Sequence, residues 1–113
     1  MPKVDYQTLD VTLLFAVTRL GLPSGVTVTL TLADISRADA PAITLAEQTL
    51  LAGPEIGFDF NLRYDSRMVD ERMTYALMAR IVHEDNLLLL NTSSCIVKLD
   101  GTQNEVTMNL DHP

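Results

Sequence analysis

Three oxygen-bearing side chains near residue 36 have a spacing that could bind calcium. Asp34, Ser36 and Asp39 follow a strand-like segment that closes at Pro41. A calcium loop of the EF-hand kind also needs a glycine at its bend and a distal bidentate glutamate, and this segment has neither. Asp and Ser at a strand end more often bond their own backbone to build a turn. We therefore expect an architectural corner in which Asp39 ties the turn and Pro41 fixes the backbone.

The histidines and the single cysteine could form a metal site only if the fold brought them together. A zinc site needs three or four converging ligands, and the candidates of these types are His83, His112 and Cys95. His112 lies in the C-terminal tail, and one cysteine allows no intramolecular disulfide. We expect an inert, half-buried thiol, no metal and no cofactor.

Hydroxyl and carboxyl groups elsewhere could suggest catalysis. Ser93 and Ser94 lack the Gly-x-Ser-x-Gly elbow and the glycine-rich oxyanion loop of serine hydrolases. Asp65, Asp70 and Glu71 alternate with arginines, which predicts solvated ion pairs and a helix cap rather than acid–base chemistry. With three Tyr, three Phe and no Trp, a sugar-stacking platform has little support. The sequence predicts no enzyme.

The elements that hold these residues show a period of two, which is typical of half-buried strands. The alternating segments are 9–17, 26–35, 43–46, 56–63, 75–83, 88–97 and 106–110. Turn residues recur between them about every ten positions. Asp65 or Ser66 would cap one short helical turn that ends at Val69. The sequence predicts an all-β chain, a single-domain antiparallel β-sandwich over residues 1–113 with about seven to eight strands.

Charge and hydrophobicity exclude several kinds of partner. The chain of 113 residues has a net charge of −7, which argues against nucleic acid and against electrostatic binding to an anionic membrane surface. Its unbroken apolar runs, such as Leu87 to Leu90, are far too short to span a bilayer. With 47% hydrophobic residues, the chain can nevertheless bury a core.

One hairpin has apolar residues on both faces. A two-residue turn at Asp85-Asn86 would pair Ile81 with Leu90 and Val82 with Leu89. The core face would then hold Tyr75, Leu77, Ala79, Ile81, Leu88 and Leu90. The opposite face would hold Met78, Val82, Leu87 and Leu89. Either another element covers these four side chains, or they are a contact surface for a protein partner or for a second copy in a homodimer.

Short motifs follow one another in order from about residue 20 to residue 92, starting with the alternating strand that leads into a Pro-closed corner. After that strand they are Ala38-Asp39-Ala40-Pro41, Ala46-Glu47-Gln48-Thr49, Phe58-x-Phe60-x-Leu62-x-Tyr64-Asp65, Asp70-x-Arg72, Tyr75-Ala76-Leu77-x-Ala79-Arg80-Ile81 and Leu88-x-Leu90-x-Thr92. In this order they resemble the YbaY-like family of bacterial outer-membrane lipoproteins, in which the YscW-type type III secretion lipoprotein chaperones (pilotins) are also grouped. The resemblance departs at the hairpin tip, where Asp85-Asn86 stands in place of the family's usual Gly.

The resemblance implies a non-catalytic domain that faces the periplasm and is held at the outer membrane by an N-terminal lipid anchor. A pilotin of this kind binds a segment of a secretin subunit and escorts it to the outer membrane. The sequence shows no signal peptide and no lipid-attachment cysteine near its start. If Met1 is the native start, the protein would be cytoplasmic. A ligand-binding domain of cell-envelope polysaccharide metabolism is the alternative function, and a deep pocket with converging polar groups would favour it.

Overall fold

Alternating apolar residues build eight strands in the part of the chain that the computed structural model describes, namely residues 6–15, 25–37, 39–52, 58–70, 72–91, 95–99 and 103–111. The elements are β1 (Tyr6–Phe15), β2 (Val26–Asp34), β3 (Ile43–Ala52), β4 (Phe58–Asp65), the 3-10 helix η1 (Ser66–Met68), β5 (Tyr75–His83), β6 (Asn86–Leu90), β7 (Cys95–Val97) and β8 (Glu105–Leu110). Within the described ranges, no helix is long and apolar enough to cross a membrane.

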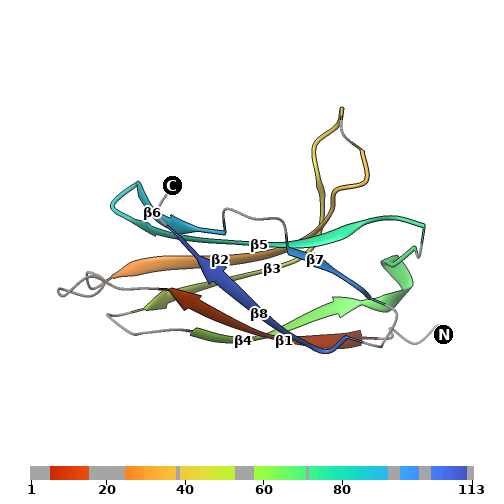
Figure 1. Cartoon of the computed structure of the whole chain (residues 1–113), viewed down its shortest axis with the longest axis horizontal. Coiled ribbons are helices and arrows are strands. Elements are labelled where there is room, and N and C mark those ends of the chain that lie inside the picture. The colour runs from red at the N-terminus through yellow and green to blue at the C-terminus, as the bar shows by residue number, and fades with distance from the viewer. Residues whose placement is uncertain are drawn as a thin grey trace.

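The strands form two sheets that pack face to face. One sheet has the order β4-β1-β8, and the other has β3-β2-β5 followed by β6 and β7, which both pair with β5. Figure 1 shows β1 and β4 in the lower layer and β2, β3 and β5 in the upper layer. The side chains of Leu9, Leu30 and Leu77 meet between the layers and are fully buried. The predicted all-β sandwich with one short helical turn is confirmed.

One pairing departs from the antiparallel prediction. β8 pairs with β1 in parallel, with Asp10 opposite Glu105 and Phe15 opposite Leu110. Parallel neighbours need a crossover connection rather than a tight turn. Here the chain passes through the opposite sheet, from β4 through β5, β6 and β7, before β8 returns to the edge of β1. The alternation of apolar and polar residues does not indicate whether a strand runs parallel or antiparallel to its neighbour.

The β5–β6 hairpin turns one residue earlier than the sequence predicts. Glu84 and Asp85 both have positive φ angles, of 49° and 67°, as a two-residue type I′ turn requires. His83 therefore pairs with Asn86 and Val82 with Leu87. A turn that is one residue nearer the N-terminus shifts the pairing of β6 with β5 by two residues, so that Val82 faces Leu87 instead of Leu89. Leu87 consequently stays on the predicted outward face, because side chains alternate with a period of two.

A β-bulge then reverses the faces of the rest of β6. Ile81 pairs with Leu89 rather than with Leu90, so Leu88 is an extra residue between two paired positions. Leu89 points into the core and is 3% exposed, while Leu90 moves to the outward side. The prediction that Leu89 lies on the outward face is therefore wrong, and so is the predicted pairing of Val82 with Leu89.

The predicted 9–17 strand is confirmed as far as Phe15, the last residue of β1 and the last one described before residue 25. The predicted 88–97 strand divides in two, because β6 stops at Leu90 before the chain pairs again in β7. Val17 and the first two residues of the predicted 56–63 strand lie outside the described residues.

Burial of Leu89 yields a matched pair of substitutions. Leu89→Glu places a carboxylate in the apolar core and should lower the free energy of unfolding by at least about 3 kcal/mol. Leu87→Glu adds the same charge two residues away on the outward face and should change it by less than about 0.5 kcal/mol. Urea unfolding followed by circular dichroism measures both. Equal stability of the two variants would contradict the bulge.

Candidate protein-contact surface

The oxygen cluster near residue 36 is an architectural corner. The backbone N–H and the hydroxyl of Ser36 both donate to Asp34 Oδ1, at 2.9 and 2.6 Å. The Thr74 N–H donates to Ser36 Oγ at 2.7 Å, and the Ile35 N–H donates to the Thr74 carbonyl. The two bonds from Ser36 lower the pKa of Asp34, and the bond from the Ser36 hydroxyl is the larger cause. The corner thus ties the end of β2 to the residue before β5.

Asp39 does not hold this corner, contrary to the sequence-based expectation. Its side chain is exposed and has no hydrogen bond to any described residue, whereas Asp34 has two. The neighbouring Ala38 lies outside the described residues.

Substitution of Ser36 tests whether its hydrogen bonds hold the corner together. Ser36→Ala removes one hydrogen bond to Asp34 and leaves the Thr74 N–H without its acceptor, so the free energy of unfolding should fall by about 1 kcal/mol. Asp39→Ala, three residues along the same loop, should leave it unchanged. Thermal melts of the two variants distinguish the residues, and a larger loss in Asp39→Ala would contradict the assignment.

The carboxylates around η1 pair with the arginines two residues after them. Asp65 accepts from the Arg67 backbone N–H at 3.0 Å and from its guanidinium at 2.9 Å. Asp70 binds Arg72 in the same way, at 2.9 and 2.8 Å. The Arg72 guanidinium is the main reason that the pKa of Asp70 falls to about 2, and Arg67 lowers the pKa of Asp65. These groups are caps and ion pairs, as the sequence indicated; Glu71 lies outside the described residues.

These pKa shifts predict how stability depends on pH. A carboxylate whose pKa is lower in the folded state than the unfolded value of about 3.9 stabilises the fold above that pH. This contribution disappears as the pH falls through the folded pKa. The melting temperature should therefore drop between about pH 4 and pH 2. Asp70→Asn should weaken this drop, and an unchanged pH profile for that variant would contradict the role of the Asp70–Arg72 pair.

The fold separates His83 and Cys95, the two candidate metal ligands that lie among the described residues. His83 lies opposite Asn86 and Cys95 lies opposite Leu77, so the two are separated by six positions along β5, or roughly 20 Å. Burial raises the pKa of the Cys95 thiol. Within the described residues, no three His, Cys, Asp or Glu side chains gather into a metal site. Ser93, Ser94 and His112 fall outside those residues.

The predicted contact residues divide between the surface and the core. Met78 and Leu87 are 39% and 40% exposed on the outer face of the β2–β5–β6 sheet. Val82, which pairs with Leu87, is half-buried on the same face, and Leu89 belongs to the core. The structure adds Leu90, opposite Arg80, to this face. We call Met78, Val82, Leu87 and Leu90 the outer apolar face.

A groove of about 610 Å³ runs beside the outer apolar face. Its floor comes from β2 and β5, with Thr29, Thr31, Ala76 and Met78 among the lining residues. Ile35 lines it at the base of the β2–β3 connection, which projects from the sandwich in Figure 1. The remaining lining residues are Glu47, Leu77, Ala79, Arg80, Leu87, Leu90, Asn91 and Cys95. Small side chains on the floor leave room for a partner to approach the sheet.

Asn91 supports this groove at a break in the sheet ladder. β6 ends at Leu90, and β7 starts at Cys95. Between them, the Ala79 N–H donates to Asn91 Oδ1 at 2.9 Å, while Asn91 Nδ2 donates to the Leu77 carbonyl at 3.4 Å. The side-chain amide thus satisfies backbone groups of β5 that a continuous strand would have bonded. The period of two in this segment does not indicate the role of Asn91, although an Asn after four leucines is a break signal.

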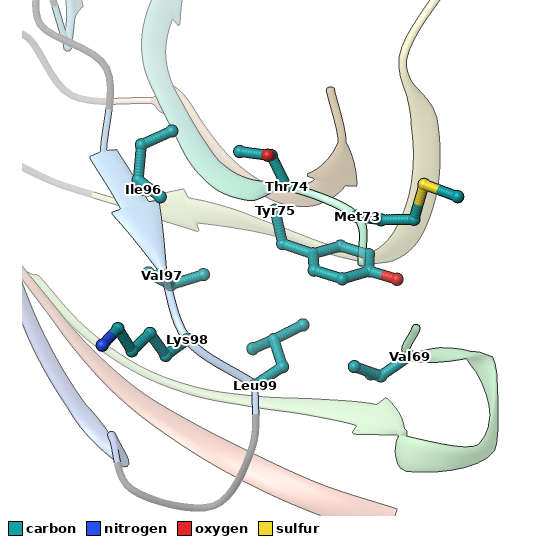
Figure 2. Close-up of a pocket in the computed structure, with 8 residues that line it drawn as sticks. All are labelled: Val69, Met73, Thr74, Tyr75, Ile96, Val97, Lys98 and Leu99. Carbon is teal, nitrogen blue, oxygen red and sulfur yellow. The ribbon is translucent and has the colours of Figure 1, made fainter. Parts of the chain in front are cut away.

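A smaller hollow of about 350 Å³ lies between the loop after η1 and β7. Figure 2 shows the Tyr75 ring between Met73, Val69 and Leu99, with the Lys98 side chain extending away from it. Tyr75 is buried, and its hydroxyl accepts from the Asp70 N–H at 2.8 Å. This hydroxyl is therefore used to hold the loop, which makes the hollow a part of the architecture.

Comparisons with known proteins give one family and one closely similar fold. The family described as type III secretion system lipoprotein chaperone (YscW) matches residues 6–110. A solved structure, described as an alternative pilotin from the type II secretion system of Vibrio cholerae, superposes with a TM-score of 0.86. It is 31% identical over 96% of this chain and 98% of its own. The curated proteins include no match.

Proposed function

This chain belongs to the family of type III secretion system lipoprotein chaperones, and from that premise we propose that it is a non-catalytic chaperone that binds a segment of a secretin subunit. The outer apolar face carries the proposal. Met78 and Leu87 are exposed apolar side chains beside a groove, where a solvated sheet face would carry polar residues. Such a surface can take up an apolar segment of another protein.

We also propose that the protein works at the outer membrane and faces the periplasm, held by an N-terminal lipid anchor. The family's description as lipoproteins supports this location. Cys95 cannot carry the anchor, because it lies within β7 and is half-buried. The attachment site would therefore precede β1. Membership of the YbaY-like branch of such lipoproteins is part of the same proposal.

The groove has little in common with a polysaccharide site. Sugar sites usually offer aromatic platforms, and none of the groove-lining residues is aromatic. Several of its polar groups are engaged within the protein: the Thr31 hydroxyl donates to Glu47 at 3.0 Å, and the Asn91 amide bonds to β5. A protein segment is therefore the better-supported occupant.

Binding of secretin peptides tests the proposal. Overlapping synthetic peptides that cover the secretin subunit of the source organism should include at least one that binds, as measured by fluorescence anisotropy. Leu87→Lys and Met78→Lys should each weaken that binding about tenfold or more, because each places a charge on the outer apolar face. Their melting temperatures should stay close to the wild-type value.

Thr107→Lys is the matched control, since it adds the same charge to an exposed position on β8 in the opposite sheet. It should bind like the wild type. If no peptide binds, the secretin assignment is wrong. If Leu87→Lys instead changes the mass measured by light scattering, the outer apolar face is a homodimer interface.

A further inference from the structure

β3 is an open edge of the larger sheet. Among the described strands it pairs only with β2, from Val26 opposite Ala52 to Asp34 opposite Ile43. In an antiparallel pair, every second residue of an edge strand directs its N–H and C=O away from its neighbour. Over ten residues, this leaves a row of backbone donors and acceptors that another extended chain can pair with.

The other described edges are shorter or better protected. β4 carries Asp59, Arg63 and Asp65 along eight residues. β6 and β7 have five and three residues, and Leu90 of β6 exchanges two backbone hydrogen bonds with Asp111 beyond β8. β3 has no Lys, Arg or Pro, and Glu47 is its one charged residue. Proteins usually protect long edges with such residues, and β3 has few of them.

Both faces of β3 expose apolar side chains. Leu50 lies opposite buried Val28, on the core side, yet it is 42% exposed. Leu51 lies opposite Thr27, on the outer side, and is 73% exposed. β4 of the smaller sheet approaches β3, but both leucines stay accessible to solvent. An added strand would bury both leucines, one on each face.

We propose that β3 takes up an extended segment of the client protein by strand addition, a proposal that rests on the chaperone function above. The client strand should carry apolar residues on both faces, beside Leu50 and Leu51. It should also carry a Lys or Arg across from Glu47, whose carboxylate accepts from the Thr31 hydroxyl on the outer face. The net charge of −7 likewise favours a basic segment over an acidic one.

A second copy of the chain fits this edge less well. Two ten-residue strands, each about 33 Å long and about 10 Å wide, would bury roughly 700 Å² in total. Stable dimers bury about 1,200–2,000 Å² or more. Two copies would also bring together two molecules of the same charge. A flexible segment avoids both difficulties, because it can extend past β3 and make further contacts.

Hydrogen exchange and matched lysine variants test the edge. The tightest-binding peptide from the secretin series is added to the wild-type protein, and amide exchange in residues 43–52 is followed by mass spectrometry. We expect exchange in this segment to slow at least tenfold. Leu51→Lys should weaken binding at least tenfold at an unchanged melting temperature, while Thr107→Lys binds normally. Replacing the peptide's basic residue with Glu should also weaken binding.

Each outcome decides the proposal. If a peptide binds, slows exchange only in residues 75–90 and tolerates Leu51→Lys, the edge proposal is wrong while the chaperone function stands. If no peptide binds the wild type, the chaperone function fails and the edge proposal fails with it. If wild-type protein sediments as a dimer that Leu51→Lys dissociates, the occupant of β3 is a second copy and the client proposal is overturned.

Discussion

Two sheets of unequal width share one core, and each sheet covers only the inner face of the other. The smaller sheet has three strands, while the larger one has β3, β2 and β5 side by side, with β6 and β7 beyond β5. Leu9 and Leu13 of β1 lie under the middle of the larger sheet and are fully buried. β4 lies close to β3, yet Leu50 and Leu51 at this margin remain exposed. The exposed leucines of β3 thus follow from its position at the edge of the sheet rather than from a local fault in the sequence.

The register of β6 depends on the same core. Leu87, Leu88, Leu89 and Leu90 form an unbroken apolar run, so hydrophobicity alone does not choose which of them faces inward. The type I′ turn at Glu84-Asp85 fixes one end of the strand, and the bond pair between Leu90 and Asp111 fixes the other. With both ends held, the bulge at Leu88 lets Leu89 fill the core beside Ile81.

This explains how far the sequence could predict the structure. Alternation located β2, β5 and β8, and the Asp-Ser pair after the alternating residues located the cap, which is Asp65, because both signals act between residues that are close in sequence. The parallel β8, the bulge at Leu88 and the break filled by Asn91 depend on contacts between distant segments. For the same reason, Met78 and Leu87 were found on the outward face, while Leu89 was placed on the wrong side.

The corner at Ser36 connects the architecture to the candidate surface. The Ser36 hydroxyl donates to Asp34, at the end of β2, and accepts from the N–H of Thr74, just before β5. This one side chain therefore links the two strands at the base of the projecting β2–β3 connection. Ile35, which lines one side of the groove, lies between Asp34 and Ser36 in the sequence, and its own N–H donates to the Thr74 carbonyl. The groove is therefore shaped by hydrogen bonds at its end and by small side chains along its floor. In the described part of this sandwich, where the helix is the three-residue η1, such corners do the positioning that helix packing does elsewhere.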